Sequence, residues 1–423
     1  MMDQMVSDLK QAARDHAFSM ALDDIDVARP DLFQNDTMWP YFERLRRDEP
    51  VHYCAQGEFG PYWSITKFDD IMAVDTNHQV FSSEATLGGI TLAGGSANID
   101  PLPMFIAMDP PKHDVQRKTV SPAVSPVNLN NLAPVIRQRA GMILDELPIG
   151  VEFDWVDKVS IELTTMTLAT LFDFPFAERR KLTRWSDVVT ARPGHGIVDT
   201  VEQRHAEMME FYAYFINLWN DRVNSSEDKG DLISMLAHSP ATRSMPPMEY
   251  FGNVVLLTVG GNDTTRNTIT GSIVALNENP DQYDLLRARP ELIPSMVSET
   301  IRWQTPLAYM RRTALSDIEF RGKHIKKGDK LAMWYISGNR DSELIVRADD
   351  YLITRENPRH HMSFGFGIHR CVGNRLAELQ LQIIWEEILK RFPNIRQVGA
   401  PRRTYSTFVH GYETLPVVID RRL

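Results

Sequence analysis

A glycine-rich segment around one of the two cysteines constrains this chain more than any other feature. It reads HMSFGFGIHRCVGN over residues 361–374 and places Gly365, Gly367 and Gly373 close to Cys371. Glycine permits backbone turns that other residues resist, and it lets a flat partner approach closely. A helical pattern follows at once, so amides at the helix N-terminus can point at the sulfur and favour its thiolate form.

The neighbours His369 and Arg370 add positive charge beside this cysteine. A lone cysteine is most often a small buried hydrophobe, but a thiolate held in such a setting can act as a nucleophile or a metal ligand. No second cysteine or histidine stands at the spacing of a zinc site, which disfavours zinc. One thiolate in one axial position is the arrangement of haem-thiolate proteins, in which the sulfur favours O–O cleavage.

A second pattern, LLTVGGNDTTRN, places Gly260 and Gly261 inside a long apolar helix predicted over residues 247–280. Each glycine costs roughly 1 kcal/mol relative to alanine, and either close helix packing or function can explain the pair. The Thr264 hydroxyl can donate to the carbonyl of Gly260, four residues earlier, and bend the helix. That bond would open a pocket for O₂ and leave Asp263 and Thr264 beside it for proton delivery.

A haem also brings two propionates, which need cationic partners. His113 and Arg117 stand four residues apart in a predicted helix and therefore share a face. Arg312 and His369 are further candidates. For each of these residues taken singly, an ordinary solvated surface charge is the favoured interpretation.

Taken together, these motifs resemble the cytochrome P450 family over nearly the whole chain. FGFGIHRCVG matches the haem-binding signature of that family, and GGNDTT resembles its oxygen-activation motif with Gly260 where alanine is common. The ETIR motif, with Glu299 and Arg302 at helical ion-pair spacing, resembles the family's helix pair. The resemblance implies that Arg355 is the third member of this network. The signature residues present are Phe364, Gly367, His369, Cys371 and Gly373.

The patterns along the chain predict a mainly α fold with small β-sheets, of the α+β class. The resemblance implies one catalytic domain over residues 1–423, shaped as the triangular prism of cytochromes P450. We expect strands on both sides of a turn at Gly57, a Gly/Ser/Ala-rich loop over residues 81–98, and mostly helices over residues 132–299. Hairpins with turns at Gly322 and Gly328 and a last buried helix over residues 375–392 should follow.

Composition limits the classes of function. The net charge of −10 disfavours nucleic-acid binding. Two cysteines cannot build a disulfide framework, and the sequence contains no signal-peptide pattern and no apolar run long enough for a membrane anchor. We therefore predict a cytoplasmic protein, in which Cys54 is structural.

A finer resemblance concerns the substrate. RWQTPLAYMRRTA, MWYISGNRD and the cysteine segment resemble the bacterial group that hydroxylates the terminal carbons of medium-chain alkanes and fatty acids. Alkanes are favoured over fatty acids, because no lysine or arginine stands in the wall segments that the resemblance places over the haem. The expected wall residues are Leu256, Leu257, Leu307, Met310, Phe408 and Val409.

The resemblance implies that Cys371 ligates the iron of haem b and that Asp263 and Thr264 deliver protons. Electrons would come from NAD(P)H through a ferredoxin reductase and a ferredoxin, and one oxygen atom of O₂ would enter a C–H bond. Lys118, Arg370 and Arg375 would steer an acidic ferredoxin.

Other functions remain open from the sequence. The substrate could be cyclic or terpenoid rather than a linear chain. A peroxide-driven relative would use the same haem, although the Asp263–Thr264 pair argues against it. A protein of another class, a non-catalytic haem sensor, usually needs an output module, and the sequence shows no linker to one.

Overall fold

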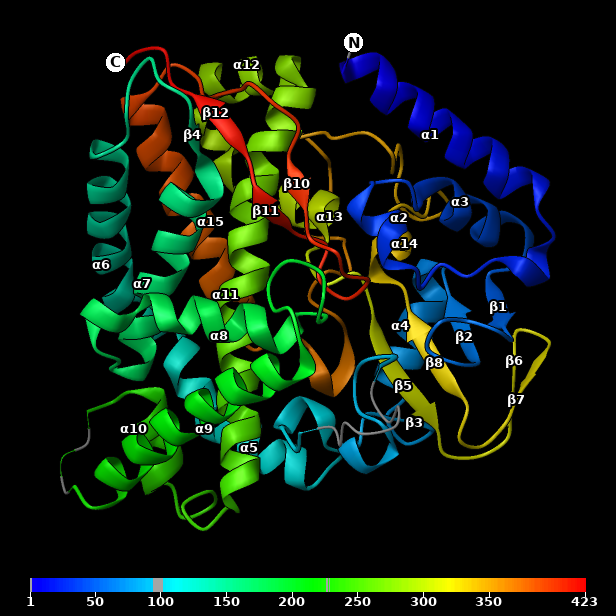
Figure 1. The fold of residues 1–423 in the computed structure, drawn as a ribbon, viewed down its shortest axis with the longest axis horizontal. Helices are drawn as coiled ribbons and strands as arrows, with labels where there is room; N and C mark the ends of the chain where they lie inside the picture. The colour runs from blue at the N-terminus through cyan, green and yellow to red at the C-terminus, as the bar shows by residue number, and fades with distance from the viewer. Residues whose placement is uncertain (1, 94–101, 226, 228) are drawn as a thin grey trace.

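The computed structural model describes residues 2–93, 102–225, 227 and 229–423. Most helices gather on one side of the molecule, and the largest sheet lies on the other (Figure 1). The fold is mainly helical with small sheets, as the sequence predicts. The α-helices are α1 Met2–Ser19, α2 Pro30–Gln34, α3 Trp39–Asp48, α4 Phe68–Thr76, α5 Lys112–Val120, α6 Pro126–Asp145, α7 Ile161–Phe172, α8 Arg180–Thr190, α9 Val201–Val223, α10 Leu232–His238, α11 Pro247–Glu278, α12 Pro280–Ala288, α13 Ile293–Gln304, α14 Tyr335–Gly338 and α15 Asn374–Arg391.

Within the described residues, short strands form four sheets, the largest with five strands in the order β1-β2-β8-β5-β3. β2 pairs parallel with β8, whereas the other neighbours in this sheet pair antiparallel. The strands are β1 Val51–Cys54, β2 Tyr62–Ile65, β3 Phe81–Ser82, β4 Phe153–Asp154, β5 Met310–Ala314, β6 Ile318–Phe320, β7 Lys323–Ile325, β8 Lys330–Met333, β9 Arg396–Gln397, β10 Arg402–Arg403, β11 Tyr412–Thr414 and β12 Pro416–Val418.

The main hydrophobic core lies among α6, α7, α11, α13 and α15. Helix α15 is apolar on several sides, and its residues Leu381, Ile384 and Trp385 are buried, as predicted. The indole of Trp385 donates to the hydroxyl of Ser272 on α11 at 2.9 Å, so even this polar atom is satisfied inside the core. These contacts hold α11 and α15 side by side, with the cysteine segment leading into α15.

Most predicted elements are confirmed. The long helix is α11, of 32 residues, and the strands around Gly57 are β1 and β2. Gly322 and Gly328 adopt φ angles of 75° and 90° at their turns, which a residue with a side chain resists. The predicted loop over residues 81–98 is wrong at its start, because β3 pairs there with β5, while residues 94–98 lie outside the described residues.

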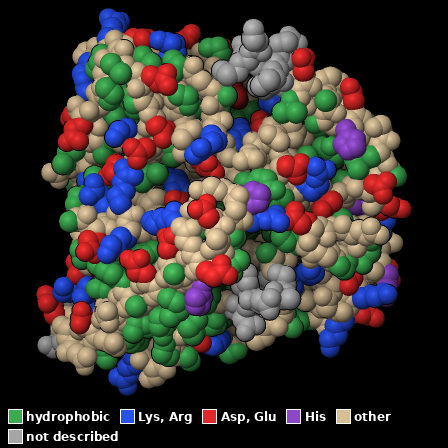
Figure 2. Space-filling model, in the orientation of Figure 1, with side chains coloured by type: hydrophobic (Ala, Val, Ile, Leu, Met, Phe, Trp, Pro, Cys, Tyr) green, Lys and Arg blue, Asp and Glu red, His purple; other side chains and the backbone are tan. Residues whose placement is uncertain are grey.

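Positive and negative side chains are mixed on the surface. On the face shown in Figure 2, side chains of Lys and Arg are interspersed with those of Asp and Glu and gather into no patch of one sign. None of the described helices is both long enough and apolar enough to cross a membrane.

Candidate active site

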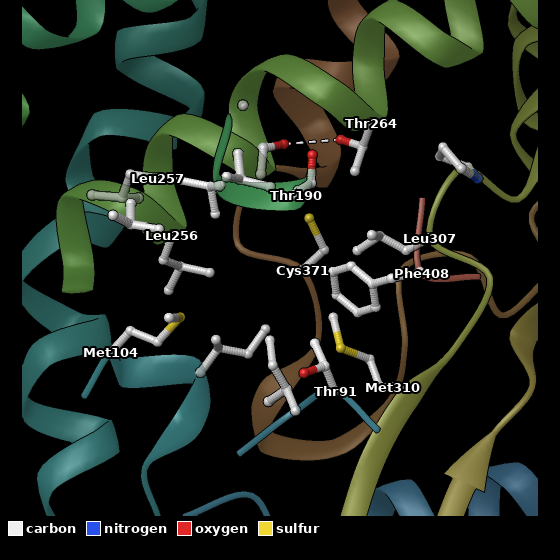
Figure 3. A pocket seen from close by; sticks show the side chains of 18 of the residues that line it. Thr91, Met104, Thr190, Leu256, Leu257, Thr264, Leu307, Met310, Cys371 and Phe408 are labelled. Atoms are coloured by element: carbon white, nitrogen blue, oxygen red, sulfur yellow. Dashed lines mark hydrogen bonds between the residues drawn. The ribbon is translucent and has the colours of Figure 1, made fainter. Parts of the chain in front are cut away.

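A cavity of about 1020 Å³ lies between α11 and the cysteine segment. Figure 3 shows the sulfur of Cys371 pointing into it, with Leu256 and Leu257 on one side and Leu307 and Phe408 on the other. Most of the lining is apolar. One thiol, helix α11 and several cationic side chains therefore surround one cavity.

The cysteine segment depends on its glycines. Gly365 and Gly367 adopt φ angles of 65° and 64°, in the left-handed region. A Cβ at Gly367 would lie 2.8 Å from the carbonyl oxygen of Asp75, so no larger residue fits there without a shift. The Cys371 amide donates to the carbonyl of Phe364 at 2.8 Å and closes the loop just before α15. Burial raises the pKa of the Cys371 thiol, whereas the Gly373 amide, Arg117 and Arg370 oppose that effect.

Asp75, which sequence reasoning missed, anchors this segment from α4. Its carboxylate accepts a hydrogen bond from the amide of Phe366 at 2.8 Å, one from the hydroxyl of Tyr335 at 2.8 Å and one from Arg312 at 2.6 Å. Asp75 stands four residues after the buried Ile71, on the buried face of an amphipathic helix. An acid at such a position is the signal that could have identified it.

The predicted bond in α11 is present. The Thr264 hydroxyl donates to the carbonyl of Gly260 at 2.9 Å (Figure 3). Gly260 and Thr264 both line the cavity, and a Cβ at Gly260 would meet no atom within 4 Å. A Cβ at Gly261 would lie 3.1 Å from Leu168 on α7, so the second glycine serves helix packing. The two explanations that the sequence left open therefore each apply to one glycine.

Asp263 does not line the cavity, so its predicted position beside the pocket is wrong. Its carboxylate is fully buried on the α8 side of α11, where it accepts a hydrogen bond from the Ser186 hydroxyl at 2.8 Å and lies 3.2 Å from Arg266. Successive helix residues are rotated by about 100°, so neighbours such as Asp263 and Thr264 face different directions. Burial raises the pKa of Asp263 to about 6; Arg266 opposes the shift and Asp187 adds to it.

The four cationic candidates come together around the cysteine. Arg117, Arg312 and His369 line the cavity, and the rings of His113 and His369 lie edge to face with centroids 4.5 Å apart. Among the described residues, both ring nitrogens of His369 and Nε2 of His113 lack a hydrogen-bond partner although they are buried. Buried polar atoms are seldom unpaired, so these nitrogens point to a group that the protein chain itself does not supply.

Five of the six residues predicted to form the substrate wall line the cavity. Leu256, Leu257, Leu307, Met310 and Phe408 line the cavity, as does Phe364 of the cysteine segment. Val409 does not line it; this residue is buried and pairs through its backbone with Leu307. Side chains alternate in direction along an extended backbone, so Phe408 and Val409 point to opposite sides.

Glu299, Arg302 and Arg355 form the predicted buried network. Arg302 donates to both carboxylate oxygens of Glu299 at 2.8 Å, and Arg355 donates to them at 2.9 and 3.1 Å. Arg302 also donates to the carbonyls of Asn339 and Ala348, at 2.8 and 2.7 Å. The network connects α13 to the segment before the cysteine loop, and these contacts stabilise the fold.

Comparison with known proteins decides the family. The model of the family described as "Cytochrome P450" matches residues 195–410. The linalool 8-monooxygenase of Pseudomonas putida is 35% identical over 405 residues, which cover 93% of this chain and 98% of that protein. The chain belongs to the cytochrome P450 family. The sequence-based prediction of a bacterial cytochrome P450 monooxygenase is confirmed.

Two solved structures show the same fold. CYP153D17 from Sphingomonas sp. PAMC 26605 is 47% identical, with a TM-score of 0.88, and the match covers 95% of this chain and 100% of that one. Cytochrome P450-153 from Novosphingobium aromaticivorans is 44% identical, with a TM-score of 0.87, over 93% of this chain and 99% of that one. This P450 is of the CYP153 kind.

Cytochromes P450 carry a haem, and the residues around the cavity fit one. The sulfur of Cys371 faces the cavity at the start of α15, and the unpaired nitrogens of His113 and His369 lie where acidic oxygens would satisfy them. Arg117 and Arg312 line the same region with guanidinium groups. The described residues include no group of three or more His, Cys, Asp or Glu side chains able to hold a metal ion.

Two more lining residues escaped sequence reasoning. Arg192 and Arg204 line the cavity from the segment after α8 and the first turn of α9. The predicted wall segments contain no lysine or arginine, as expected, but these two arginines reach the same cavity from other segments. The glycine- and proline-containing TARPGHG stretch, which interrupts the helical pattern, was the only available signal.

Proposed function

We propose that this P450 hydroxylates the terminal carbon of slender apolar chains, with medium-chain alkanes and fatty acids as the substrate class. The main supporting observation is the apolar lining around Cys371, where Leu307, Met310 and Phe408 lie opposite Leu256 and Leu257 (Figure 3). Internal C–H bonds are weaker than those of a terminal methyl, so selecting the chain end needs steric restriction. The similarity to the CYP153 structures supports this proposal.

We assign the haem-binding roles to the residues that meet in the cavity. Cys371 would hold the iron as a thiolate, Arg117 and Arg312 would neutralise the propionates, and His369 and His113 would form hydrogen bonds with them through their ring nitrogens. When bound, the haem supplies the redox chemistry by which one oxygen atom of O₂ enters a C–H bond and the other leaves as water, with two electrons and two protons consumed. The apolar wall holds the chain end in place and keeps excess water away from it.

Thr264 is the proposed proton donor at the cavity. Its Oγ1 atom is held in place by the bond to the Gly260 carbonyl, and the missing side chain at Gly260 leaves room beside it. Asp263, behind the same turn, is the proposed proton source. Its carboxyl has a pKa raised to about 6, it contacts Ser186 and Arg266, and its Oδ2 atom makes no hydrogen bond to the described residues. A group with a pKa near neutrality exchanges protons readily in both directions.

Electrons for this reaction come, we propose, from NAD(P)H through a ferredoxin reductase and a ferredoxin. Lys118, Arg370 and Arg375 are exposed on the elements next to Cys371, where they can attract an acidic carrier. The single catalytic domain and the cytoplasmic location stay predictions.

A second substrate class is favoured by one observation. The relative at 35% identity is a linalool 8-monooxygenase, so a terpenoid is the alternative to a linear chain. The test is product analysis by gas chromatography and mass spectrometry with octane, dodecanoic acid and a cyclic terpene. Primary alcohols from the linear substrates support the proposal. Exclusive internal hydroxylation, or activity on the terpene alone, overturns it.

A further inference from the structure

The part of the cavity lining that comes from the β1–β2 loop and from the segments around α8 and α9 carries charge. Among the described residues, the charged side chains that line the cavity outside the Cys371 region are those of Glu58, Arg192 and Arg204. Arg192 pairs with Glu58 from the loop between β1 and β2, and both side chains are partly exposed, so this part of the cavity opens to solvent. Of these three residues, Arg204 is the one without a carboxylate partner among the described residues.

The segment that carries Arg192 lies against the C-terminal part of the chain. His195 stacks on the ring of Tyr405 with centroids 3.9 Å apart, and Arg192 lies 6.0 Å from the centroid of the same ring. Figure 1 shows the loop after α8 beside the loop between β10 and β11. This exposed part of the cavity wall is therefore built from three parts of the chain that are far apart in sequence.

Arg204 is a half-buried guanidinium without an acidic partner. Its Nε and Nη2 atoms donate to the carbonyls of Val188 and Val189 at 3.1 and 2.9 Å, at the end of α8. Within the described part of the chain, no carboxylate forms an ion pair with it, and its Nη1 atom donates no hydrogen bond. Burial lowers the pKa of Arg204. Arginine stays charged in proteins, so a half-buried cation that lines an apolar cavity favours an anionic ligand.

We propose that Arg204 binds the carboxylate of a fatty acid whose alkyl chain runs along the apolar cavity toward Cys371. The proposal rests on the proposed function and selects the fatty acid from its two substrate classes. A guanidinium N–H binds a carboxylate through a short charge-assisted hydrogen bond. The apolar lining, including Leu256 and Leu257, matches the alkyl chain, and only the ionised end of such a molecule needs a cation.

Arg204 also supports the end of α8, so its two roles must be separated. A purely structural role would affect every ligand, whereas carboxylate recognition affects only the anionic one. Dodecanoate and dodecan-1-ol share the alkyl chain and differ at the head group. The ratio of their affinities therefore reports recognition, whatever the variant does to the local fold.

The experiment measures the Kd of both ligands for the haem-loaded protein by isothermal titration calorimetry and by the substrate-induced change in the Soret band. Arg204→Gln should weaken dodecanoate binding roughly tenfold to a hundredfold and leave dodecan-1-ol within about twofold. The matched control is Lys181→Gln, which removes a positive charge from an exposed position on α8 outside the cavity. This variant should change the Kd of neither ligand. Equal loss for both ligands, or no loss for dodecanoate, overturns the proposal.

A second variant guards against an unfolded Arg204→Gln protein. Glu58→Gln removes the acid that neutralises Arg192, so dodecanoate should bind severalfold more tightly while dodecan-1-ol does not change. Unchanged dodecanoate affinity contradicts the proposal. The position of hydroxylation is measured separately: a wild type that prefers dodecanoate through Arg204 but oxidises internal carbons refutes the proposed terminal hydroxylation and not the carboxylate site.

Discussion

Glu299→Gln should destabilise the protein far more than its conservative shape suggests. The Glu299 side chain is fully buried, and it compensates Arg302, also fully buried, and Arg355, whose side chain is 9% exposed. Glutamine keeps the shape but removes the charge, which leaves two guanidinium groups uncompensated. Removing one partner of a buried ion pair costs about 3–5 kcal/mol, against a total stability of roughly 5–15 kcal/mol for typical proteins.

The expected change in melting temperature follows from the size of the protein. An unfolding entropy of about 2.1 cal/mol/K per residue amounts to roughly 0.9 kcal/mol/K over 423 residues. A loss of about 3–5 kcal/mol therefore lowers the midpoint by roughly 3–6 °C. Thermal unfolding followed by circular dichroism measures it. The control is Glu343→Gln, which breaks an ion pair with Lys67 whose acid is 67% exposed and should shift the midpoint by less than about 1 °C.

The same variant makes a prediction about pH. Burial, the largest single influence, would raise the pKa of Glu299, but the hydrogen bonds from Arg302, Arg355 and the Leu352 amide, together with the charge of Arg302, outweigh it and hold the pKa below its ordinary value of 4.5. The stabilisation from this carboxylate is therefore fully present above about pH 4.5 and is lost as the pH falls below it. The difference between wild type and variant should shrink in acid. A midpoint within 1 °C of wild type at neutral pH would refute the reasoning.

Three further predictions concern turnover. Thr264→Ala should bind substrate but release hydrogen peroxide in place of product. Asp263→Asn should slow turnover without unfolding the protein. If both variants form the normal amount of product per NADH consumed, the proton-delivery proposal is wrong. Phe408→Ala should shift the product from primary toward internal alcohols, whereas Val409→Ala, outside the cavity, should not. Equal product shifts in the two variants would refute the proposed steric selection of the chain end by Phe408. Reduction by ferredoxin should slow as salt is raised, and Arg375→Gln should weaken that dependence; a rate independent of salt removes the electrostatic docking.

Local patterns predicted much of the site, because the relevant interactions are short in sequence. The Thr264 hydroxyl and the Gly260 carbonyl are one helical turn apart, so helix geometry alone brings them into contact. The glycines around Cys371 predict a turn, because glycine adopts backbone conformations that other residues resist. The Glu299–Arg302 pair is likewise set by helical spacing.

Contacts between distant segments could not be predicted in this way. Asp75 meets the amide of Phe366 across 291 positions of sequence, and no periodicity encodes that pairing. The arrangement of α8 and α9 decides that Arg204 lines the cavity. Asp263 is a different case. The rotation of about 100° between helix neighbours predicts that Asp263 and Thr264 face different directions, but their shared motif suggested that both lie beside the pocket.

The central claim is that Cys371 holds a haem as its thiolate ligand, and the carbon monoxide spectrum of the reduced protein tests it most directly. The wild type should absorb at the red-shifted Soret position that thiolate ligation gives. Cys371→Ser should lose this band, with correct folding checked by circular dichroism. An unchanged red-shifted band in Cys371→Ser would contradict the assignment of the ligand and with it the account of the site.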